Sequence, residues 1–505
     1  MASAGWQIIS TDSYNYKCVC TTSDGKTSYV CTQDGRILKS SNNGRSYSQI
    51  YHNPTYNFNI ICCSSDGRYV YVTAQVISGV SGVLISTNFG ANFSFIQIYS
   101  QLGLSNHNIT CSHNGAVVAY LAYDGATQMT QHYSINYGTS FNTGSTILGG
   151  IMSGANQFIS NTTGNIIFGC TNLGIYYSGD NGINFFRINF QFDGNATGIA
   201  CTSDGTRLYI KTNNNLFFAI DNNVSYATYY TNTNNTMNFI VSSDTGSYLC
   251  SAYSTGTLSY ANTASISNDG GHYFTQQTLP SSGSINNISS IATNSTGTTT
   301  YITDSSGFIY QYLKPGTCLM ENSKISTING EINIQDLKKG DLIKSTYNKD
   351  GINKIKYIPL EHLGYGTINF SNGDNLFEVK TIKASSFSSE NLPTEDIFLT
   401  RMHSILVNEN EKEKYINENY INNIKYYEKA IKIEGYEKIL AAHCNKCINT
   451  SLDDMKEKFG EMGKYYHIVL LDKDDKKEHA IFVSGIPVES CSKKWFDKSE
   501  LTKIF

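Results

Sequence analysis

The first 317 residues of this 505-residue chain are short of charged side chains. They contain 10 Lys and Arg and 12 Asp, and no Glu occurs before Glu321. A hydrolase built on a placed pair of carboxylates is disfavoured here, because most of these Asp residues belong to turn-like phrases. The remaining 188 residues hold 27 Lys and Arg and 29 Asp and Glu. Each part has a net charge near −2, which argues against binding of nucleic acid.

Long apolar runs and targeting signals are also missing. No stretch approaches the roughly 18 uninterrupted apolar residues of a membrane span, and the N-terminal MASAGWQIISTDS has no basic segment. We expect neither a membrane span nor a signal peptide, and favour a cytoplasmic location. Without secretion, the 13 cysteines are expected to be reduced thiols. Nine precede Cys318, in segments such as KCVCTT and IICCSS, where we expect small buried apolar side chains.

A short phrase that ends in Gly recurs through the first part, at spacings of 41 to 51 residues. Asp-Gly between two alternating apolar runs indicates a hairpin, because Gly accepts the positive φ of such a turn. Repeats of this length with about four strands each are typical of propeller blades, and seven phrases predict seven blades. The phrases are TSDG (22–25), SSDG (64–67), SHNG (112–115), NTTG (161–164), TSDG (202–205), SDTG (243–246) and NSTG (294–297).

A second phrase follows about 20 residues later in most repeats. It resembles the Asp-box of sialidase-like β-propellers, in which polar side chains satisfy turn amides and an aromatic plugs the gap between strands. The resemblance implies an all-β, seven-bladed propeller over residues 1–312. The strand-like WQIIS (6–10) would complete the last blade, whose repeat lacks an outer strand. In the fifth repeat, DNNVSY (221–226), Val224 replaces the glycine. The copies are SSNNGRSY (40–47), STNFGANF (86–93), SINYGTSF (134–141), SGDNGINF (178–185) and SNDGGHYF (267–274), the last shifted by one residue.

The propeller resemblance does not by itself name an activity. A sialidase-like site needs an arginine cluster, whereas four of the five arginines lie in or beside turn phrases and are expected to be solvated. We therefore expect a binding or scaffold platform for an unknown protein or glycan ligand, in preference to a propeller hydrolase. Tyr and Phe would suit a ligand-binding face, but we favour the reading that they fill the space between blades. The arginines are Arg36, Arg45, Arg68, Arg187 and Arg207.

The composition changes at Cys318, after a predicted linker at 313–317. Three blocks of the second part, residues 318–505, resemble the all-β Hint fold shared by Hedgehog C-terminal domains and inteins. The nearest variety is carried on proteins of large DNA viruses and protists, so a host cytoplasm or a virion would suit the chain. The blocks are CLMENSKISTINGEINIQDLKKGDLIKS (318–345), IFLTRMHSILV (397–407) and HAIFVSGIPVESCS (479–492).

The resemblance implies a catalytic set of Cys318, Thr400, His403 and Cys491. A cysteine next to its own upstream carbonyl attacks it through a five-membered ring, which moves the acyl group from nitrogen to sulfur. The leaving nitrogen must be protonated, and a histidine suits this step because its pKa lies near working pH. The bond predicted to break is Thr317–Cys318. No cofactor and no metal are expected, nor turnover of an external substrate.

Each residue also has a plain structural interpretation. Cys318 would fit a buried cysteine that starts a strand, His403 a core histidine, and Cys491 a packed cysteine. His443-Cys444-x-x-Cys447 offers soft ligands, but zinc takes four and no second pair stands nearby. The alternative function is therefore a non-enzymatic propeller interaction protein with an inactive Hint domain.

The sequence also bears on which group accepts the acyl from the thioester at Cys318. Splicing needs a C-terminal Asn, and the chain ends KSELTKIF. Sterol transfer of the Hedgehog kind uses an Asp, and the corresponding region (356–370) offers only Glu361. We expect water or a small thiol or amine to resolve the thioester, directly or after transfer to Cys491.

Overall fold

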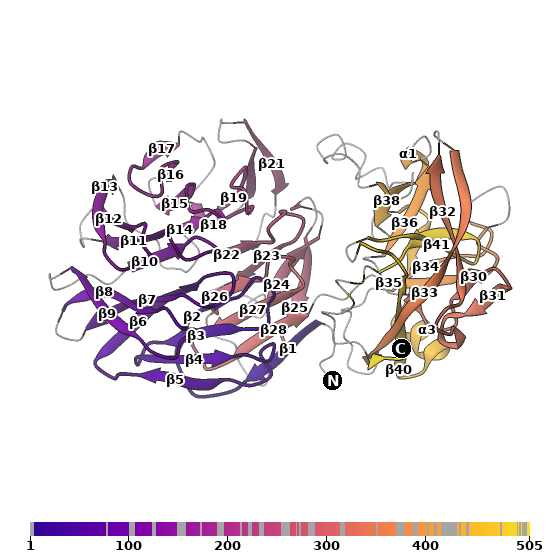
Figure 1. Cartoon of the computed structure of the whole chain (residues 1–505), viewed down its shortest axis with the longest axis horizontal. Coiled ribbons are helices and arrows are strands. Elements are labelled where there is room, and N and C mark those ends of the chain that lie inside the picture. The colour runs from indigo at the N-terminus through magenta and orange to yellow at the C-terminus, as the bar shows by residue number, and fades with distance from the viewer. Residues whose placement is uncertain are drawn as a thin grey trace. The chain divides into compact units, whose positions relative to one another are not determined.

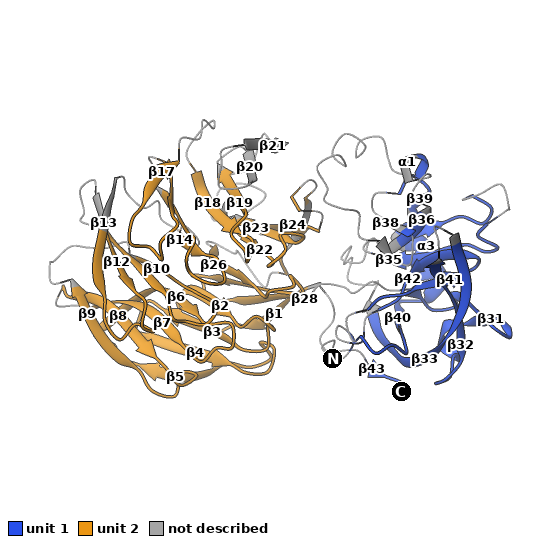
Figure 2. Ribbon diagram, turned by 45° about the horizontal axis from the view of Figure 1, so that its top comes forward, with its two compact units in different colours: residues 1–5, 314–505 blue, residues 6–313 orange. Residues whose placement is uncertain are grey.

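The computed structural model of the chain divides into two compact units, Trp6–Leu313 and Lys314–Phe505 together with Met1–Gly5 (Figure 2). Each unit is described by itself. Strands outnumber helices in each unit, as Figure 1 shows. The structure describes residues 5–505 except 77–78, 100–106, 124–127, 149–157, 172–173, 189–195, 213–214, 221–224, 232–236, 254–262, 269, 272–273, 281–287, 314–318, 350–351, 370–378, 387–391, 401–402, 409–411, 416–431, 434–435, 441–443, 475–476, 492, 494–495 and 497–501.

The first unit contains six four-stranded antiparallel sheets that are each built from consecutive strands. Antiparallel neighbours can be joined by short turns, so a sheet of this kind can be continuous in sequence. The first three are β2 (Tyr16–Thr21), β3 (Ser28–Thr32), β4 (Arg36–Ser40) and β5 (Ser48–His52); β6 (Tyr56–Cys63), β7 (Val70–Val76), β8 (Ser81–Ser86) and β9 (Ser94–Tyr99); and β10 (His107–Cys111), β11 (Val118–Tyr123), β12 (Gln128–Ser134) and β13 (Asn142–Leu148). The next three are β14 (Phe158–Ser160), β15 (Ile167–Thr171), β16 (Gly174–Ser178) and β17 (Phe186–Ile188); β18 (Ala196–Cys201), β19 (Arg207–Thr212), β20 (Asn215–Ile220) and β21 (Ser225–Thr231); and β22 (Met237–Ser242), β23 (Leu249–Tyr253), β24 (Thr263–Ser267) and β25 (Thr275–Thr278).

A further four-stranded sheet joins the two ends of the unit. The N-terminal strand β1 (Gly5–Ser10) pairs with β28 (Ile309–Leu313), which continues into β27 (Thr299–Asp304) and β26 (Ile288–Thr293). The prediction that the N-terminal strand completes the last sheet is confirmed. Six blades are therefore continuous in sequence, against the seven that the repeats predicted. This composite sheet brings the four-stranded sheets of the described residues to seven.

The seven Gly-ending phrases form a closed ring of backbone hydrogen bonds. The N–H of the second residue of each phrase donates to the carbonyl of its counterpart in the next, at N···O distances of 2.7 to 3.1 Å. A ring of this kind places the first strands of the sheets around one axis, as in a β-propeller. The residues, in donor-to-acceptor order, are Ser23, Ser65, His113, Thr162, Ser203, Asp244 and Ser295, which donates back to Ser23.

The Ser-x-Asn/Asp-x-Gly phrases are turns held by their own side chains. Ser40 Oγ accepts from Gly44 N at 2.9 Å, and Asn42 Oδ1 accepts from Ser46 N at 3.1 Å. Gly44 has a φ of 78°, a conformation that Gly adopts without steric cost. The divergent fifth copy at 221–224 lies outside the described residues.

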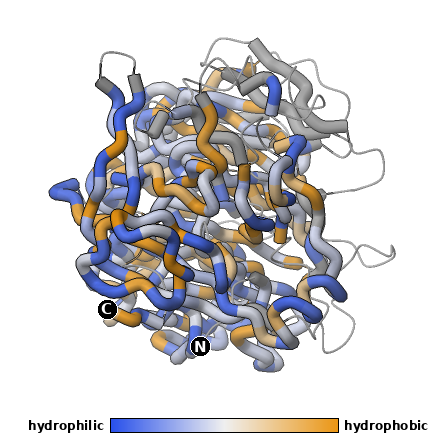
Figure 3. Tube along the Cα trace, turned by 90° about the vertical axis from the view of Figure 1, so that its right-hand side faces the viewer, coloured by the Kyte–Doolittle hydropathy of each residue, from blue (hydrophilic) through white to orange (hydrophobic). Residues whose placement is uncertain are grey.

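Tyrosines fill the space between sheets, as expected. Tyr29, Tyr71 and Tyr301 are fully buried. Each hydroxyl donates to the carbonyl of a phrase glycine one repeat away, and Tyr71 does so to Gly115 at 2.7 Å. Hydrophobic and hydrophilic residues alternate over short distances along the tube in Figure 3, as strands with buried and exposed positions require.

In its described residues, the second unit is one 15-stranded sheet with the 3-10 helix η1 and the α-helices α1 and α3. Its all-β character confirms the predicted class, whereas its assignment to the Hint fold stays a prediction. The path through the sheet runs β37-β38-β36-β42-β41-β30-β32-β33-β40-β29-β35-β34-β39, with β31 beside β30 and β43 beside β33. The elements are β29 (Leu319–Met320), β30 (Lys324–Thr327), β31 (Gly330–Asn333), η1 (Ile334–Asp336), β32 (Leu342–Lys349), β33 (Ile352–Asn369), β34 (Val379–Ile382), β35 (Ile397–Thr400), β36 (Ser404–Asn408), α1 (Lys412–Tyr415), β37 (Lys432–Ile433), β38 (Tyr436–Leu440), β39 (Cys447–Asn449), α3 (Leu452–Phe459), β40 (Met462–Leu470), β41 (Ala480–Val483), β42 (Ile486–Glu489) and β43 (Thr502–Lys503).

Candidate functional site

The short strand β29 brings the start of the second unit between two distant segments. Leu319 pairs with Leu399 of β35 on one side and with Tyr466 of β40 on the other. Thr400 and His467 directly follow these two partners in sequence. Thr317 and Cys318 lie outside the described residues. Cys318 is the residue before Leu319 in the sequence.

His403 and His467 form the buried centre of this region. His403 lies between β35 and β36 and is 2% exposed, and His467 lies in β40 and is 1% exposed. The pKa of His467 is lowered to about 3, first by burial and second by repulsion from nearby His403. The two rings are thus close enough to interact electrostatically, and His467 is neutral at neutral pH.

Cys491 lies beside the same strand. Its N–H donates to the carbonyl of Ile468 at 2.8 Å, and its side chain packs with Val469 and Phe496. His467 and Val469 are two residues apart in β40, so they share one face of the sheet. Burial, followed by the nearby carboxylates of Glu478 and Glu489, raises the pKa of the Cys491 thiol well above its usual value. The thiol is therefore protonated at neutral pH, and transfer of an acyl group to it would require removal of that proton.

Thr400 is the last residue of β35, where its backbone pairs with Val379 of β34. The strand end thus precedes His403 by three residues, as the Thr-x-x-His spacing requires. Two of the four predicted catalytic residues, His403 and Cys491, are therefore described in full around β40, and Thr400 is described through its backbone.

His467 and His479 were not in the predicted catalytic set. His467 stands out in sequence only as one polar residue within the apolar run YYHIVLL, which does not reveal its neighbour. His479 is 1% exposed, and its Nε2 lies 3.3 Å from Asp472 Oδ2. Its backbone exchanges hydrogen bonds with Ser490, the residue before Cys491.

Glu361 is engaged in an ion pair with Lys493, a residue near the C-terminal end of the sequence. Lys493 Nζ lies 2.8 Å from Glu361 Oε1 and 2.7 Å from His362 Nε2. The pairing occupies the Glu361 carboxylate.

The described residues contain no group of three or more His, Cys, Asp or Glu arranged to hold a metal ion. The N–H of Cys447 donates to the carbonyl of Cys444 at 3.1 Å, and His443 lies outside the described residues. Within the described part of the chain, no helix has the length and apolar character to cross a membrane.

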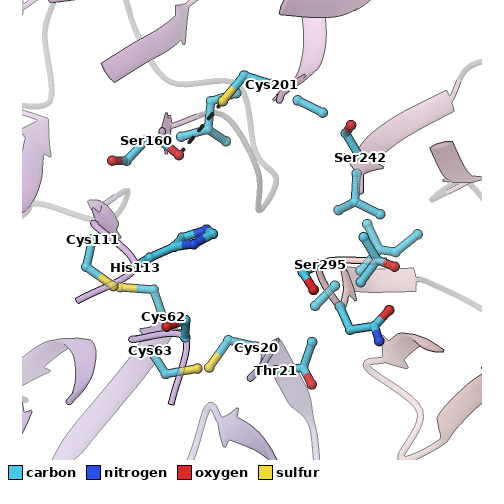
Figure 4. A pocket seen from close by; sticks show the side chains of 18 of the residues that line it. Cys20, Thr21, Cys62, Cys63, Cys111, His113, Ser160, Cys201, Ser242 and Ser295 are labelled. Atoms are coloured by element: carbon cyan, nitrogen blue, oxygen red, sulfur yellow. Dashed lines mark hydrogen bonds between the residues drawn. The ribbon is translucent and has the colours of Figure 1, made fainter. Parts of the chain in front are cut away.

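The first unit holds a separate cavity of about 270 Å³, lined by the first strands of its sheets (Figure 4). Its lining includes Cys18, Cys20, Cys62, Cys63, Cys111 and Cys201. Of the nine propeller cysteines, for which we expected burial, five are buried and four are not. Four are partly exposed, namely Cys62, Cys63, Cys111 and Cys201, and all four line this cavity. The reason is that the first strands border open space at the ring axis.

The closed ring and its surrounding sheets define the first unit as a β-propeller. No protein-family model matches the chain, and no curated protein matches it. Among solved structures it is similar to YCF48 from Cyanidioschyzon merolae, with 12% identity over 61% of this chain and 99% of that chain, at a TM-score of 0.46. The structure of YCF48 bound to D1 peptide matches at 13% identity over 62% of this chain and 97% of that one, with a TM-score of 0.47. The GH74 xyloglucanase from Xanthomonas campestris matches at 11% identity over 65% of this chain and 58% of that one, with a TM-score of 0.48. At these values the similarities carry no argument about function.

Proposed function

We propose that the chain is a self-cleaving protein, in which the second unit breaks the Thr317–Cys318 bond and releases the propeller. The observation that carries the proposal is the pairing of Leu319 between Leu399 and Tyr466. It joins the residue after Cys318 to the strand that ends in Thr400 and to the strand that carries His467. In this proposal the propeller is of the Asp-box kind, and the second unit is a Hint domain of the viral and protist kind. The protein would act in a host cytoplasm or a virion.

The proposed reaction has two steps. The Cys318 sulfur attacks the Thr317 carbonyl carbon, a C–S bond forms and the C–N bond breaks. The thiol proton passes to His403, which delivers a proton to the nitrogen that leaves as an amine. Water or a small thiol or amine then attacks the thioester and releases the Cys318 thiol. With water, the products are a Thr317 carboxylate and a free Cys318 amine. Neutral His467 beside His403 avoids a second buried positive charge.

Intact mass measurement of fresh and aged protein tests the cleavage. We expect fragments of 317 and 188 residues. Cys318→Ala should abolish them, and His403→Ala should slow their appearance about 100-fold or more. Cys444→Ala, a buried cysteine of the same unit, and His132→Ala, a buried histidine of the propeller, are matched controls that should cleave normally. Cleavage at the same bond in Cys318→Ala would show that a contaminating protease is responsible.

Added dithiothreitol or hydroxylamine tests the thioester. A thioester reacts with thiols far faster than an amide does, so either reagent should accelerate release of the propeller. The released piece should carry a free carboxylate at Thr317 or the adduct of the added nucleophile. A sterol or other lipid on Thr317, or a chain rejoined across the second unit, would contradict this outcome.

A propeller that only binds or scaffolds a partner is the second candidate. The observation that favours it is the open cavity at the ring axis together with the absence of Glu from the first unit. A wild-type protein that keeps its full mass on ageing, with and without dithiothreitol, would favour this function over cleavage.

A further inference from the structure

Two pairs of thiols lie across neighbouring blades at the propeller cavity. Cys63 of β6 lies close enough to Cys20 of β2, and Cys111 of β10 close enough to Cys62 of β6, to disfavour the thiolate of its partner. Figure 4 shows Cys20 beside Cys63 and Cys62 beside Cys111. Cys62 and Cys63 are consecutive in a strand, so their side chains point to opposite faces, one toward each neighbouring blade.

The two pairs occupy equivalent positions. In each pair, the first cysteine lies five residues before the Gly that ends the phrase of its repeat. The second cysteine lies four residues before the Gly that ends the phrase of the next repeat. The corresponding positions at the other five interfaces hold at most one thiol. They are Thr110 and Ser160, Ile159 and Cys201, Ala200 and Ser242, Val241 and Thr293, and Ala292 and Thr21.

The paired thiols are partly accessible from the cavity, whereas the propeller cysteines that do not line the cavity are buried. Cys62, Cys63 and Cys111 are partly exposed and line the cavity. Three others, Cys31, Cys170 and Cys250, are buried and do not line it. A small oxidant in the cavity therefore reaches the pairs before these three.

We propose that Cys20–Cys63 and Cys62–Cys111 are sites of reversible disulfide formation that covalently join the first three blades. With hydrogen peroxide as the oxidant, one thiolate attacks a peroxide oxygen, the O–O bond breaks, and a sulfenic acid forms. The partner thiol displaces the hydroxyl as water, which forms the S–S bond. Formation of each disulfide thus removes two protons and two electrons from a pair of thiols and reduces one hydrogen peroxide to two waters. A dithiol reductant reverses the reaction.

The rate should depend on pH. Burial, followed by the neighbouring thiols, raises the pKa of both Cys20 and Cys62 well above the usual value. The thiolate is the reactive form, so oxidation should be slow near neutral pH and should accelerate as pH rises.

The test is peptide mapping of the folded full-length chain in a Cys318→Ala background, after peroxide and alkylation of the remaining thiols. We expect two disulfides, Cys20–Cys63 and Cys62–Cys111, and a rise of several degrees in the melting temperature of the propeller. Cys63→Ser should remove the first bond alone, and Cys111→Ser the second alone. Ser already stands at the equivalent Ser160 and Ser242, so both variants are expected to fold.

Cys201→Ser is the matched control. Cys201 shares the position and exposure of Cys63 and Cys111, but Ile159 stands where its partner thiol would be. This variant should keep both bonds. Several results would overturn the proposal: alkylatable Cys20 and Cys62 after oxidation, a vicinal Cys62–Cys63 bond, a bond to Cys201, or sulfonic acid at these thiols in place of a bond.

Discussion

Two of the buried histidines of the second unit, His403 and His467, come from segments more than 60 residues apart in the chain. Both are almost fully buried, and each disfavours a charge on the other. Such a pair is costly to protonate twice, because burial and repulsion both oppose the second positive charge. At the residue scale this gives the protein a measurable pH dependence that does not require cleavage.

The first prediction concerns that pH dependence. The pKa of His467 is about 3 in the folded state, against about 6.5 when unfolded. Above about pH 6.5 neither state is protonated, and His467 leaves the free energy of unfolding unchanged. As pH falls from 6.5 toward 3, only the unfolded state binds the proton, so that free energy falls by at most about 5 kcal/mol.

Urea unfolding at pH 7 and pH 4.5 measures the effect. His467→Gln should lose less stability between the two pH values than the wild type does. His52→Gln, which changes an exposed histidine of β5, should behave like the wild type. An unchanged pH dependence in His467→Gln would contradict the assignment.

At the scale of elements, the Ser-x-Asn/Asp-x-Gly turns carry much of the local order of the propeller. Asp180 accepts from the backbone N–H groups of Ile183 and Asn184 at 3.1 and 2.9 Å. Partial burial opposes the shift, but hydrogen bonds from Asn184, Ser178 and Ile183 together hold the pKa of its carboxyl below the usual value. The equivalent Asn42, Asn88 and Asn136 make similar bonds without charge.

The second prediction follows from this equivalence. Asp180→Ala leaves turn amides without their acceptor, and should destabilise the propeller by about 1–2 kcal/mol. Asp180→Asn should retain most of the wild-type stability, because Asn serves at the same place in three other turns. Thermal unfolding of the three proteins measures the difference. Equal melting temperatures for the Ala and Asn variants would show that the side-chain acceptor is unimportant.

At the scale of the whole propeller, closure depends on residues from the two ends of the unit. Gln7 Nε2 donates to Gln311 Oε1 at 2.9 Å, and the ring of Trp6 lies 5.2 Å from that of Tyr312. Trp6 is 5% exposed. Strand β1 also covers the edge of β28, which would otherwise present unpaired backbone groups.

The third prediction is that closure fails without this strand. Trp6→Ala should destabilise the propeller by about 3–5 kcal/mol, and deletion of residues 1–10 should cause aggregation through the open edge. Deletion of residues 1–4, which precede β1, is the matched control and should behave like the full chain. Thermal unfolding and size-exclusion chromatography measure both effects. A monomeric 1–10 deletion with an unchanged melting temperature would contradict the role of β1.

Much of this architecture was determined by the sequence alone. The recurring Gly phrases locate the hairpins, since few residues other than Gly tolerate their positive φ. The missing outer strand of the last repeat predicted the pairing of Trp6–Ser10 with residues 299–312. The composition change predicted a boundary at Cys318, and the chain divides into its compact units between Leu313 and Lys314.

Only the tertiary structure decided which side chains meet. Alternation along IICCSS says that Cys62 and Cys63 point apart, but not that each finds a thiol on a neighbouring blade. Likewise, nothing local to YYHIVLL reveals that His467 lies near His403. The physical reason is that turns depend on the φ and hydrogen bonds of a few adjacent residues. A meeting between distant strands depends instead on their register, which the packing of the whole sheet determines.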